Sequence, residues 1–304
     1  MKKKYRVTDP DPWSETRPSQ AIRMDLDSKP YRPKRRRKGC LTLILIAALA
    51  AVYLFLPSRH TIVILGIDRA FENTSIGRSD TNILLSVKPL PGTVSVLSIP
   101  RDLWVTIPGY GENRINTAHF YGEEERAGHG PELSVTTMEQ NFGIQIDHYL
   151  RIQLEQFPQV VDAMGGVELK LDTNMAGYSA GTHHLNGAQS LAFVRDRAGT
   201  DDFFRMAQGQ VFLTSFIRTL LKPTIWLNAP DILLAMVQTI DTDVPLWQMP
   251  RLAVAALRAF FFEKIDFVII QREFVVPWVT SAGAQVLLPD WAKIQPLLQE
   301  EFGN

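Results

Sequence analysis

Hydrophobic residues beyond position 59 occur in short runs or at alternate positions, and this pattern predicts β-strands. Four such segments are separated by turns containing Pro, Gly and Asn, at residues 60–66, 82–87, 93–99 and 103–107. Three later segments, "HYLRI", "GVELKL" and "DFVII", have the same character. These segments are expected to supply the strands of a β-sheet.

Other segments place apolar residues three and four positions apart, which predicts helices with one buried face. They cover residues 131–142, 154–164 and 203–221, and the tail predicts two more helices before "DFVII" and a last one from "PDWAKI". Strands mixed with helices in this order indicate an α/β fold. We therefore expect a three-layer α/β/α sandwich with a central mixed sheet, formed by one domain over residues 58–304.

An uncharged, proline-free stretch of 17 residues, "CLTLILIAALAAVYLFL" at residues 40–56, precedes this domain. It is just long enough to cross the hydrocarbon layer of a membrane. The basic run "KRRRK" lies on its N-terminal side, so the positive-inside rule predicts a transmembrane helix over residues 40–57, with residues 1–39 in the cytoplasm and the domain outside. The alternative is a cleaved signal peptide ending near Ala50, but its n-region would be long and the apolar run continues past that site.

Charge is distributed unevenly along the 304-residue chain. Lys plus Arg and Asp plus Glu each total 32, but residues 1–38 hold 13 basic against 5 acidic residues, which leaves 19 against 27 for the rest. The polar, proline-rich arm 1–39 is predicted to be disordered, and its basic charge is explained by topology and anionic lipid, not by nucleic acid. Cys40 is the only cysteine, which excludes an intramolecular disulfide and a CxxC metal site.

Common catalytic signatures are absent from the sequence. It contains no GxSxG nucleophile elbow, no GxxxxGK[ST] phosphate loop and no HExxH zinc helix. The stretch "PGYGENR" has only two of the three glycines of GxGxxG and indicates a turn. His183 and His184 have no further residue with metal-ligand spacing nearby, so we expect a loop there, just before a helix.

Charged residues gather where predicted strands begin or end. Strand ends of an α/β sheet are where ligands normally bind, because loops there present polar groups without disturbing the core. Asp68 ends the first strand, Arg78 and Asp80 open the second, and Arg101 follows the third. The later run "LAFVRDRAGTDDFFR" adds Arg195, Arg197, Asp202 and Arg205. Arg195 and Arg197 share a face if this segment is extended. Asp202 and Arg205 share one face of a helix.

These five arginines and two of the aspartates form a chemically consistent set. The planar guanidinium offers paired donors that match phosphate oxygens, and it stays charged in any environment. Asp68 and Asp80 offer hard oxygen ligands for Mg²⁺, which typically combines one or two carboxylates with substrate phosphates. Together the residues predict a site for a pyrophosphate and a divalent metal.

The ordered run "GID…GRSDT…VLSIPRD…INTAH…VDAMGGVEL…LNGAQSLAFVRDR…DDFFR" resembles the LytR-CpsA-Psr family of cell-wall glycopolymer ligases. The likeness extends from about Thr61 to the C-terminus, and the arm and single anchor are similar to the family's architecture. The resemblance implies a bacterial phosphotransferase at the outer face of the cell membrane. Such an enzyme is expected to move a glycopolymer, such as teichoic acid or capsule, from a polyprenyl pyrophosphate carrier onto a peptidoglycan hydroxyl, forming a phosphodiester.

The resemblance also implies a role for each charged residue. Asp68 and Asp80 would hold Mg²⁺, with Mn²⁺ as the other candidate, and Asp202 would orient Arg205 or help to accept a proton. The pyrophosphate would be held by Arg78, Arg101, Arg195, Arg197 and Arg205. Catalysis itself would depend on Arg78, Arg101, Asp202 and Arg205. Phosphoryl transfer of this kind relies mainly on positioning and charge neutralisation.

The predicted helix after Asp202 departs from the family at one position. Family members usually have an Arg-Gln pair three and four residues after the arginine that matches Arg205, where this chain has Gln208 and Gly209. Gln210 is the nearest substitute, so one pyrophosphate contact is expected to be missing or replaced. The lipid carrier also needs an apolar slot. The helical stripe Phe212, Phe216 and Leu220 could line it, although such a stripe also suits a plain core.

Two other functions are compatible with the same residues. A polyprenyl pyrophosphate hydrolase would use water as the acceptor at the same site, and only an acceptor assay separates it from a ligase. A non-catalytic anchored protein would bind anionic wall polymer or, through its arm, nucleic acid. Aspartates beside the arginines would repel a polyanion, so the transferase is the favoured hypothesis.

Overall fold

The computed structural model describes residues 37–69, 76–196 and 202–303, except for the side chains of residues 37–40, 68, 69, 202 and 226. The chain divides into two units, Met1–Ala47 and Ala48–Asn304. Helix α1 (Arg37–Phe55) contains most of the apolar stretch assigned above to a membrane span. Among the residues that the structure describes, no helix has the length and apolar character needed to cross a membrane. The membrane span and the domain boundaries at residues 39 and 57 stay predictions.

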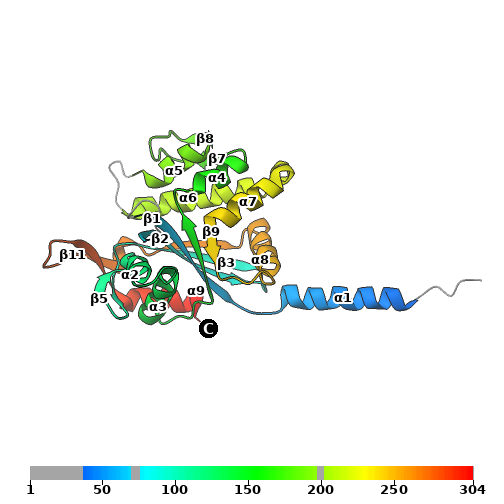
Figure 1. Cartoon of the computed structure of the whole chain (residues 1–304), viewed down its shortest axis with the longest axis horizontal. Helices are drawn as coiled ribbons and strands as arrows, with labels where there is room; N and C mark the ends of the chain where they lie inside the picture. The colour runs from blue at the N-terminus through cyan, green and yellow to red at the C-terminus, as the bar shows by residue number, and fades with distance from the viewer. Residues whose placement is uncertain (1–36, 70–75, 197–201, 304) are drawn as a thin grey trace, which may run out of the picture. The chain divides into compact units, whose positions relative to one another are not determined.

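A six-stranded mixed sheet forms the centre of the second unit (Figure 1). Its strands are β1 (His60–Arg69), β2 (Gly77–Lys88), β3 (Thr93–Ile99), β6 (His148–Gln153), β9 (Ile240–Thr242) and β10 (Ile265–Ile269). Their order across the sheet is β10-β3-β2-β1-β6-β9. The β1–β6 and β3–β10 pairs are parallel, and the other three are antiparallel. The expected α/β fold with a central mixed sheet is confirmed.

Three two-stranded hairpins lie outside this sheet. They are β4 (Trp104–Ile107) with β5 (Gly111–Arg114), β7 (Val167–Leu171) with β8 (Gly181–Leu185), and β11 (Val275–Val279) with β12 (Gln285–Pro289). The strand expected at residues 103–107 therefore exists but belongs to a hairpin. The loop expected at His183 and His184 is wrong, because both lie in β8, with their side chains outside the buried core.

Helices cover both faces of the central sheet (Figure 1). On one face, α2 (Thr117–Glu125), α3 (Gly130–Phe142) and α9 (Trp291–Phe302) pack against β1 residues such as Val63 and Leu65. On the other, α6 (Asp202–Leu220) and α8 (Met249–Phe261) pack against residues such as Ile83 and Val96. The remaining helices are α4 (Phe157–Ala163), α5 (Gly187–Arg195), α7 (Ala229–Thr239) and the 3-10 turns Pro223–Asn228 and Arg272–Phe274.

The apolar run of β1 reflects this double covering. Side chains of a strand point alternately to its two faces. Val63, Leu65 and Ile67 join the cluster beneath α2, α3 and α9, whereas Ile64 packs on the α6 and α8 side. Because both faces are buried, β1 reads as a continuous apolar run instead of an alternating one.

Candidate active site

An apolar cavity of about 180 Å³ lies between the central sheet and α6. The sheet contributes apolar side chains such as Ile64, Ile83 and Ile99. α6 closes the opposite side with Met206, Gly209, Phe212, Leu213 and Phe216. Phe212 and Phe216 therefore line this cavity, whereas Leu220 packs in a separate cluster with Val160 and Met164. A cavity with these walls suits an extended apolar chain.

Three charged residues also line this cavity, and all three were predicted site residues. Asp80 comes from β2, Arg101 follows β3 after a single proline, and Arg205 lies in the first turn of α6. Among the described residues, no other charged side chain lines the cavity. The structure therefore combines an apolar compartment with two guanidinium groups and a carboxylate, which suits an amphiphile with an anionic head.

A β-bulge places Asp80. The β1–β2 register passes from Gly66 opposite Thr81 to Ile67 opposite Ser79, so that it steps over Asp80. Such a bulge bends its strand and redirects the extra side chain. A Cβ atom at Gly66 would come within 2.9 Å of Cβ of Thr81, so glycine permits the close approach of the two strands here.

The Asp80 carboxylate is held from two directions. One oxygen accepts a hydrogen bond from Nη1 of Arg101 at 3.1 Å, and the other accepts one from Nδ2 of Asn116 at 3.3 Å. Asn116 also joins β2 to the turn after β3 through its backbone, since its carbonyl accepts from Ser79 N–H and its N–H donates to the Arg101 carbonyl. The buried Asn116 therefore fixes the position of Asp80 relative to Arg101.

The ion pairs around Arg101 continue toward the β5 hairpin. Nε of Arg101 lies 3.6 Å from the Asp102 carboxylate, which in turn lies 3.2 Å from Nε of Arg114. Positive and negative groups thus alternate along this edge of the site. The alternation orients Arg101, because its guanidinium contacts a carboxylate on each side.

Two other predicted residues that the structure describes, Arg78 and Arg195, do not line the cavity. Arg78 is exposed and lies opposite Asp68 in the β1–β2 register, so the backbone brings these two positions together. Arg195 ends α5, so the extended conformation considered for it is wrong. Arg197 lies outside the described residues, as do the side chains of Asp68 and Asp202. Asp202 begins α6 three residues before Arg205, as the helical pattern predicted.

Gly209 lies on the cavity wall one turn after Arg205, and a Cβ atom there would meet nothing within 4 Å. Gln208 instead points into the core, where its Nε2 donates to the Phe193 carbonyl. Nε2 of Gln210 donates to Oγ of Ser98 and to the Val268 carbonyl, both at 3.2 Å. Neither glutamine lines the cavity, so neither amide occupies the position that a glutamine side chain at residue 209 would have.

The oxygen atoms around Asp80 fit a hard divalent cation. Oδ1 of Asn116 is buried and has no hydrogen-bond partner among the described residues, although its own amide group contacts Asp80. An amide oxygen and a carboxylate are both ligands that Mg²⁺ accepts. The described residues contain no cluster of three or more His, Cys, Asp or Glu side chains with metal-binding geometry. Asp68, whose backbone lies opposite Arg78, is the further carboxylate that the sequence suggests.

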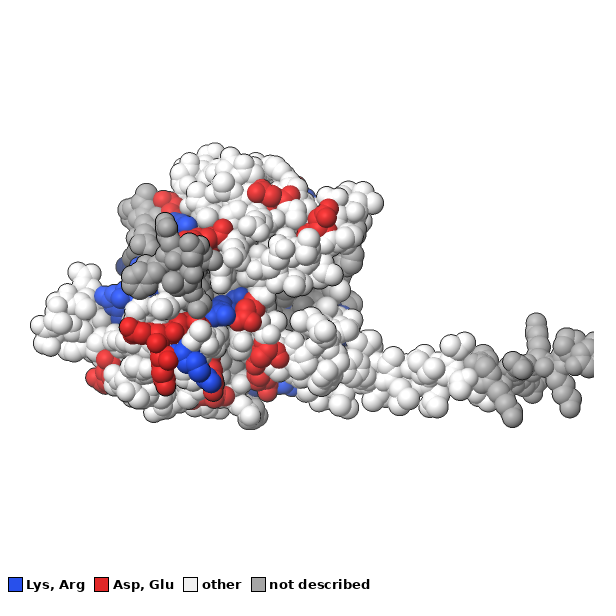
Figure 2. All heavy atoms as spheres, in the orientation of Figure 1, with Lys and Arg blue, Asp and Glu red and all other residues white. Residues whose placement is uncertain are grey.

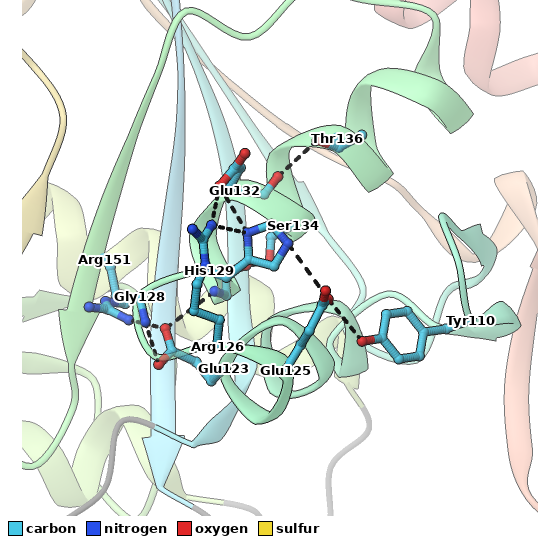
Figure 3. Close-up of polar contacts among 11 residues, drawn as sticks. Tyr110, Glu123, Glu125, Arg126, Gly128, His129, Glu132, Ser134, Thr136 and Arg151 are labelled. Carbon is cyan, nitrogen blue, oxygen red and sulfur yellow. Dashed lines mark hydrogen bonds and ion pairs between the residues drawn. The ribbon is translucent and has the colours of Figure 1, made fainter.

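A buried polar cluster supports the start of β2. Nδ1 of the fully buried His119 donates to the Gly77 carbonyl at 2.8 Å, and burial lowers the pKa of His119 to about 4, so the ring is neutral near pH 7. Its Nε2 lies 4.0 Å from the buried carboxylate of Glu123. That carboxylate accepts from Nη1 of Arg151 at 2.6 Å and from the N–H of Gly128 at 3.1 Å (Figure 3).

Sequence reasoning missed Asn116 and His119 because each resembles an ordinary helix residue. An asparagine at the start of a helix normally indicates an N-cap. Asn116 occupies that position in α2, yet its side chain makes no capping hydrogen bond and contacts Asp80 instead. The motif "INTAH" was the only signal available, since it stood among the runs that carried the family resemblance.

Sequence relatives of the chain have names connected with the cell wall. It is 41% identical over 140 residues to a polyisoprenyl-teichoic acid–peptidoglycan teichoic acid transferase TagU of Oceanobacillus iheyensis, covering 45% of this chain and 43% of the relative. It is 33% identical over 193 residues to a probable cell wall biosynthesis protein LcpB of Corynebacterium glutamicum, covering 59% and 44%. The chain thus spans less than half the length of these two relatives.

Solved structures share the fold. The crystal structure of Bacillus subtilis TagV matches with a TM-score of 0.65 at 24% identity, covering 80% of this chain and 97% of that one. A structure of TagT bound to LIIa-WTA matches with a TM-score of 0.62 at 24% identity, covering 81% and 91%. At these identities the likeness concerns the arrangement of the sheet and helices.

The family assignment rests on the length of the match together with these relatives. A profile of the LytR_cpsA_psr family matches residues 57–295, which is most of the chain and includes all the strands and the residues that line the cavity. The recognition made from the ordered motifs is thereby confirmed. The chain belongs to the LytR_cpsA_psr family.

Proposed function

We propose that this protein is a Mg²⁺-dependent phosphotransferase that moves a glycopolymer from a polyprenyl pyrophosphate carrier onto peptidoglycan. The observation that carries the proposal is the apolar cavity lined also by Arg101, Arg205 and Asp80. Its walls suit the polyprenyl chain, and its two guanidinium groups suit the pyrophosphate. The names of the TagU relatives, which specify a polyisoprenyl-linked teichoic acid and peptidoglycan, support the same pair of substrates.

The reaction follows from the charges at the cavity. A sugar hydroxyl of peptidoglycan attacks the phosphorus atom nearest the glycopolymer, and the bond from that phosphorus to the polyprenyl phosphate breaks. The products are a phosphodiester, polyprenyl phosphate and the proton of the hydroxyl. Arg101 and Arg205 stabilise the negative charge that grows on the departing phosphate. Asp202, which begins the helix of Arg205, is the proposed partner of that arginine or acceptor of the proton.

Asp68 and Asp80 are the residues that would hold Mg²⁺, with the unbonded amide oxygen of Asn116 beside Asp80. When bound, the ion would neutralise charge on the pyrophosphate and orient it. Asp80 in addition holds Arg101 through its ion pair at 3.1 Å. Loss of the Asp80 carboxylate would therefore disturb both the metal and the arginine.

The same proposal includes a location. Residues 40–57 would cross the cell membrane once, with residues 1–39 in the cytoplasm and the catalytic domain outside. This arrangement places the cavity on the side where peptidoglycan lies and next to the membrane that carries the polyprenyl lipid. Its support is the apolar stretch at residues 40–56 and the "KRRRK" run before it.

Purified full-length protein supplied with a polyprenyl pyrophosphate-linked glycan and peptidoglycan tests this function. Wild type should attach glycan to peptidoglycan in the presence of Mg²⁺. Arg101→Ala should lower kcat about 10²- to 10³-fold, the usual effect of removing a group that stabilises transition-state charge. The exposed Arg126, which pairs with Glu132 and His129 and does not line the cavity, provides the matched control Arg126→Ala. Equal rates for the folded Arg101→Ala protein and wild type would refute the proposal.

A further inference from the structure

The second unit has an exposed apolar surface away from the proposed active site. We define it by six residues of α7, the turn before it and the turn before α8: Leu227, Leu233, Leu234, Val237, Leu246 and Trp247. Leu227 is 85% exposed, Leu246 is 80% exposed and Trp247 is 62% exposed. Apolar side chains in such a group are unusual on a surface that faces only water.

The pattern within α7 shows that its apolar outer face is separate from its packing face. Ile232 and Ala235 are buried and pack against α4 through Val160 and Met164. Leu233, Leu234 and Val237 are exposed at the positions between, on the side away from this cluster. Asp231, in the first turn, is the one charged residue of α7, whereas Figure 2 shows charged side chains of both signs gathered over α2 and α3. α7 is thus apolar on two faces, of which one is buried in the core and the other is exposed.

The end of the apolar stretch contacts this region within the same unit. Oη of Tyr53 donates to the Trp247 carbonyl, and the two rings lie 6.4 Å apart. Arg251 donates to the Leu56 carbonyl, and the Arg258 guanidinium lies 5.0 Å from the ring of Phe55. The exposed surface therefore begins where the apolar stretch ends. Tyr, Trp and Arg are also the side chains that favour the boundary between lipid and water.

We propose that this surface docks on the lipid bilayer, so that α7 and the Leu246–Trp247 turn enter its outer boundary region. The inference rests on the membrane anchoring proposed above, and it adds a second attachment to that of the anchor. The bilayer is the occupant because Trp247 of this surface contacts Tyr53 at the end of the apolar stretch, and Arg258 of the neighbouring α8 contacts Phe55 there. An apolar helix face that lies in the plane of a membrane binds by burying its side chains at this depth. Docking would hold the domain close to the membrane that carries its lipid-linked substrate.

Spin labels on the full-length protein test the docking. Cys40 is the only cysteine, so Cys40→Ser gives a background for labels at Leu234→Cys and Leu246→Cys. Val276→Cys is the matched control, since Val276 is 58% exposed, Leu234 is 59% exposed, and β11 lies at the other end of the body from α7 (Figure 1). The protein is reconstituted in vesicles of phosphatidylethanolamine and phosphatidylglycerol, and collisions with oxygen and with a water-soluble nickel complex are measured. Labels at Leu234 and Leu246 should collide more with oxygen and less with nickel than the label at Val276.

Two results with the spin labels would overturn the docking. One is equal exposure of all three labels to the nickel complex. The other is protection of Leu234 and Leu246 that disappears when the protein is diluted in lipid, which would assign the surface to a second copy of the chain. A double variant, Leu234→Ser with Leu246→Ser, should slow transfer from a long-chain carrier in vesicles and leave transfer from a short, water-soluble carrier unchanged. Loss of both reactions would contradict docking, and absence of transfer by wild type would contradict the proposed function alone.

Discussion

Asn116 joins β2, which carries Asp80, to the turn after β3, which carries Arg101. Its side chain contacts Asp80, and its backbone bonds to Ser79 and Arg101 on either side. A buried residue with one side-chain bond and two backbone bonds of this kind positions its neighbours. Its effect on the reaction should therefore be felt through the geometry of Asp80.

We expect Asn116→Ala to lower kcat/KM by about 10- to 100-fold, because a hydrogen bond to a charged group is worth about 1.5 to 3 kcal/mol. Steady-state kinetics of transfer measures this change. The matched control is Asn113→Ala, since Asn113 donates to Oη of Tyr121 at 2.8 Å, away from Asp80. A folded Asn116→Ala protein with wild-type kinetics would show that Asp80 does not depend on this contact.

Gly209 provides a second prediction at this scale. A glutamine there would enter the cavity one turn beyond Arg205, so Gly209→Gln should preserve or raise kcat/KM, whereas Arg205→Ala should lower it strongly. Gly209→Ala is the control that distinguishes the effect of the glutamine amide on transfer from the effect of replacing a glycine within a helix. Alanine should raise the free energy of unfolding by about 1 kcal/mol without changing kcat/KM. If Gly209→Gln abolishes transfer in a folded protein and Arg205→Ala does not, the placement of α6 against the pyrophosphate is wrong.

The start of β2 depends on the buried cluster of His119, Glu123 and Arg151. Burial keeps His119 neutral, with a pKa lowered from 6.5 to about 4. Folding therefore favours the unprotonated ring, so the stability that this group contributes is complete above pH 6.5 and is lost as the pH falls toward 4. The fully buried Glu123 carboxylate also needs Arg151, because a buried charge left alone is strongly destabilising.

Unfolding of the full-length protein in detergent by urea should show this pH dependence. Between about pH 7.5 and about pH 5 the free energy of unfolding should fall by about 2 kcal/mol on account of His119. His119→Asn keeps an N–H donor for the Gly77 carbonyl, but asparagine does not titrate. The free energy of unfolding of this variant should therefore fall less than that of wild type over the same pH range. An identical pH dependence for the two proteins would show that protonation of His119 does not cause the loss of stability between about pH 7.5 and about pH 5.

The elements with strong apolar patterns could be predicted from the sequence. β3 has the expected bounds, Thr93–Ile99, and α6 differs from its expected range by one residue at each end. Both are long, regular and flanked by turn residues. α2 was missed because its buried face includes Thr117, His119 and Glu123, which break the apolar period. Polar residues are buried when they have hydrogen-bonding partners elsewhere in the chain, and a local sequence pattern does not show these partners.

The sequence likewise predicted some features of the candidate site and not others. Asp80, Arg101 and Arg205 were predicted from their places at element ends, and all three line one cavity. The extended conformation considered around Arg195 was wrong because the capping box of Asn186 and Gln189 starts a helix that runs through Arg195. The bulge at Asp80 was not predictable, since it depends on the register between two strands.

At the scale of the whole molecule, the proposed topology has residues 1–39 and the domain 58–304 on opposite sides of the membrane. Protease added to intact spheroplasts should remove the domain and spare residues 1–39, because the "KRRRK" run keeps the arm inside. Antibodies against the arm and the domain measure the two fates on one blot. A domain that stays protected until the membrane is lysed would reverse the proposed topology.

A divalent metal should be needed for transfer. Asp68→Asn and Asp80→Asn each remove a hard anionic ligand, so each should reduce transfer severely and raise the Mg²⁺ concentration needed for half-maximal rate. Titration with Mg²⁺ and Mn²⁺ after chelation measures this need. Asp172→Asn, on the exposed turn after β7, provides a control for the loss of a carboxylate elsewhere. Full turnover in chelator would show that transfer does not need a divalent metal.

The most direct test of the central claim is the stoichiometry of the reaction catalysed by the full-length protein. With a doubly labelled carrier, the amount of polyprenyl phosphate released and the amount of glycan joined to peptidoglycan are measured together. Transfer by this protein should give equal amounts, a phosphodiester at the new junction, and loss of both products in Arg101→Ala. Release of polyprenyl phosphate with the glycan phosphate left free in solution, and none on peptidoglycan, would contradict transfer and identify a hydrolase.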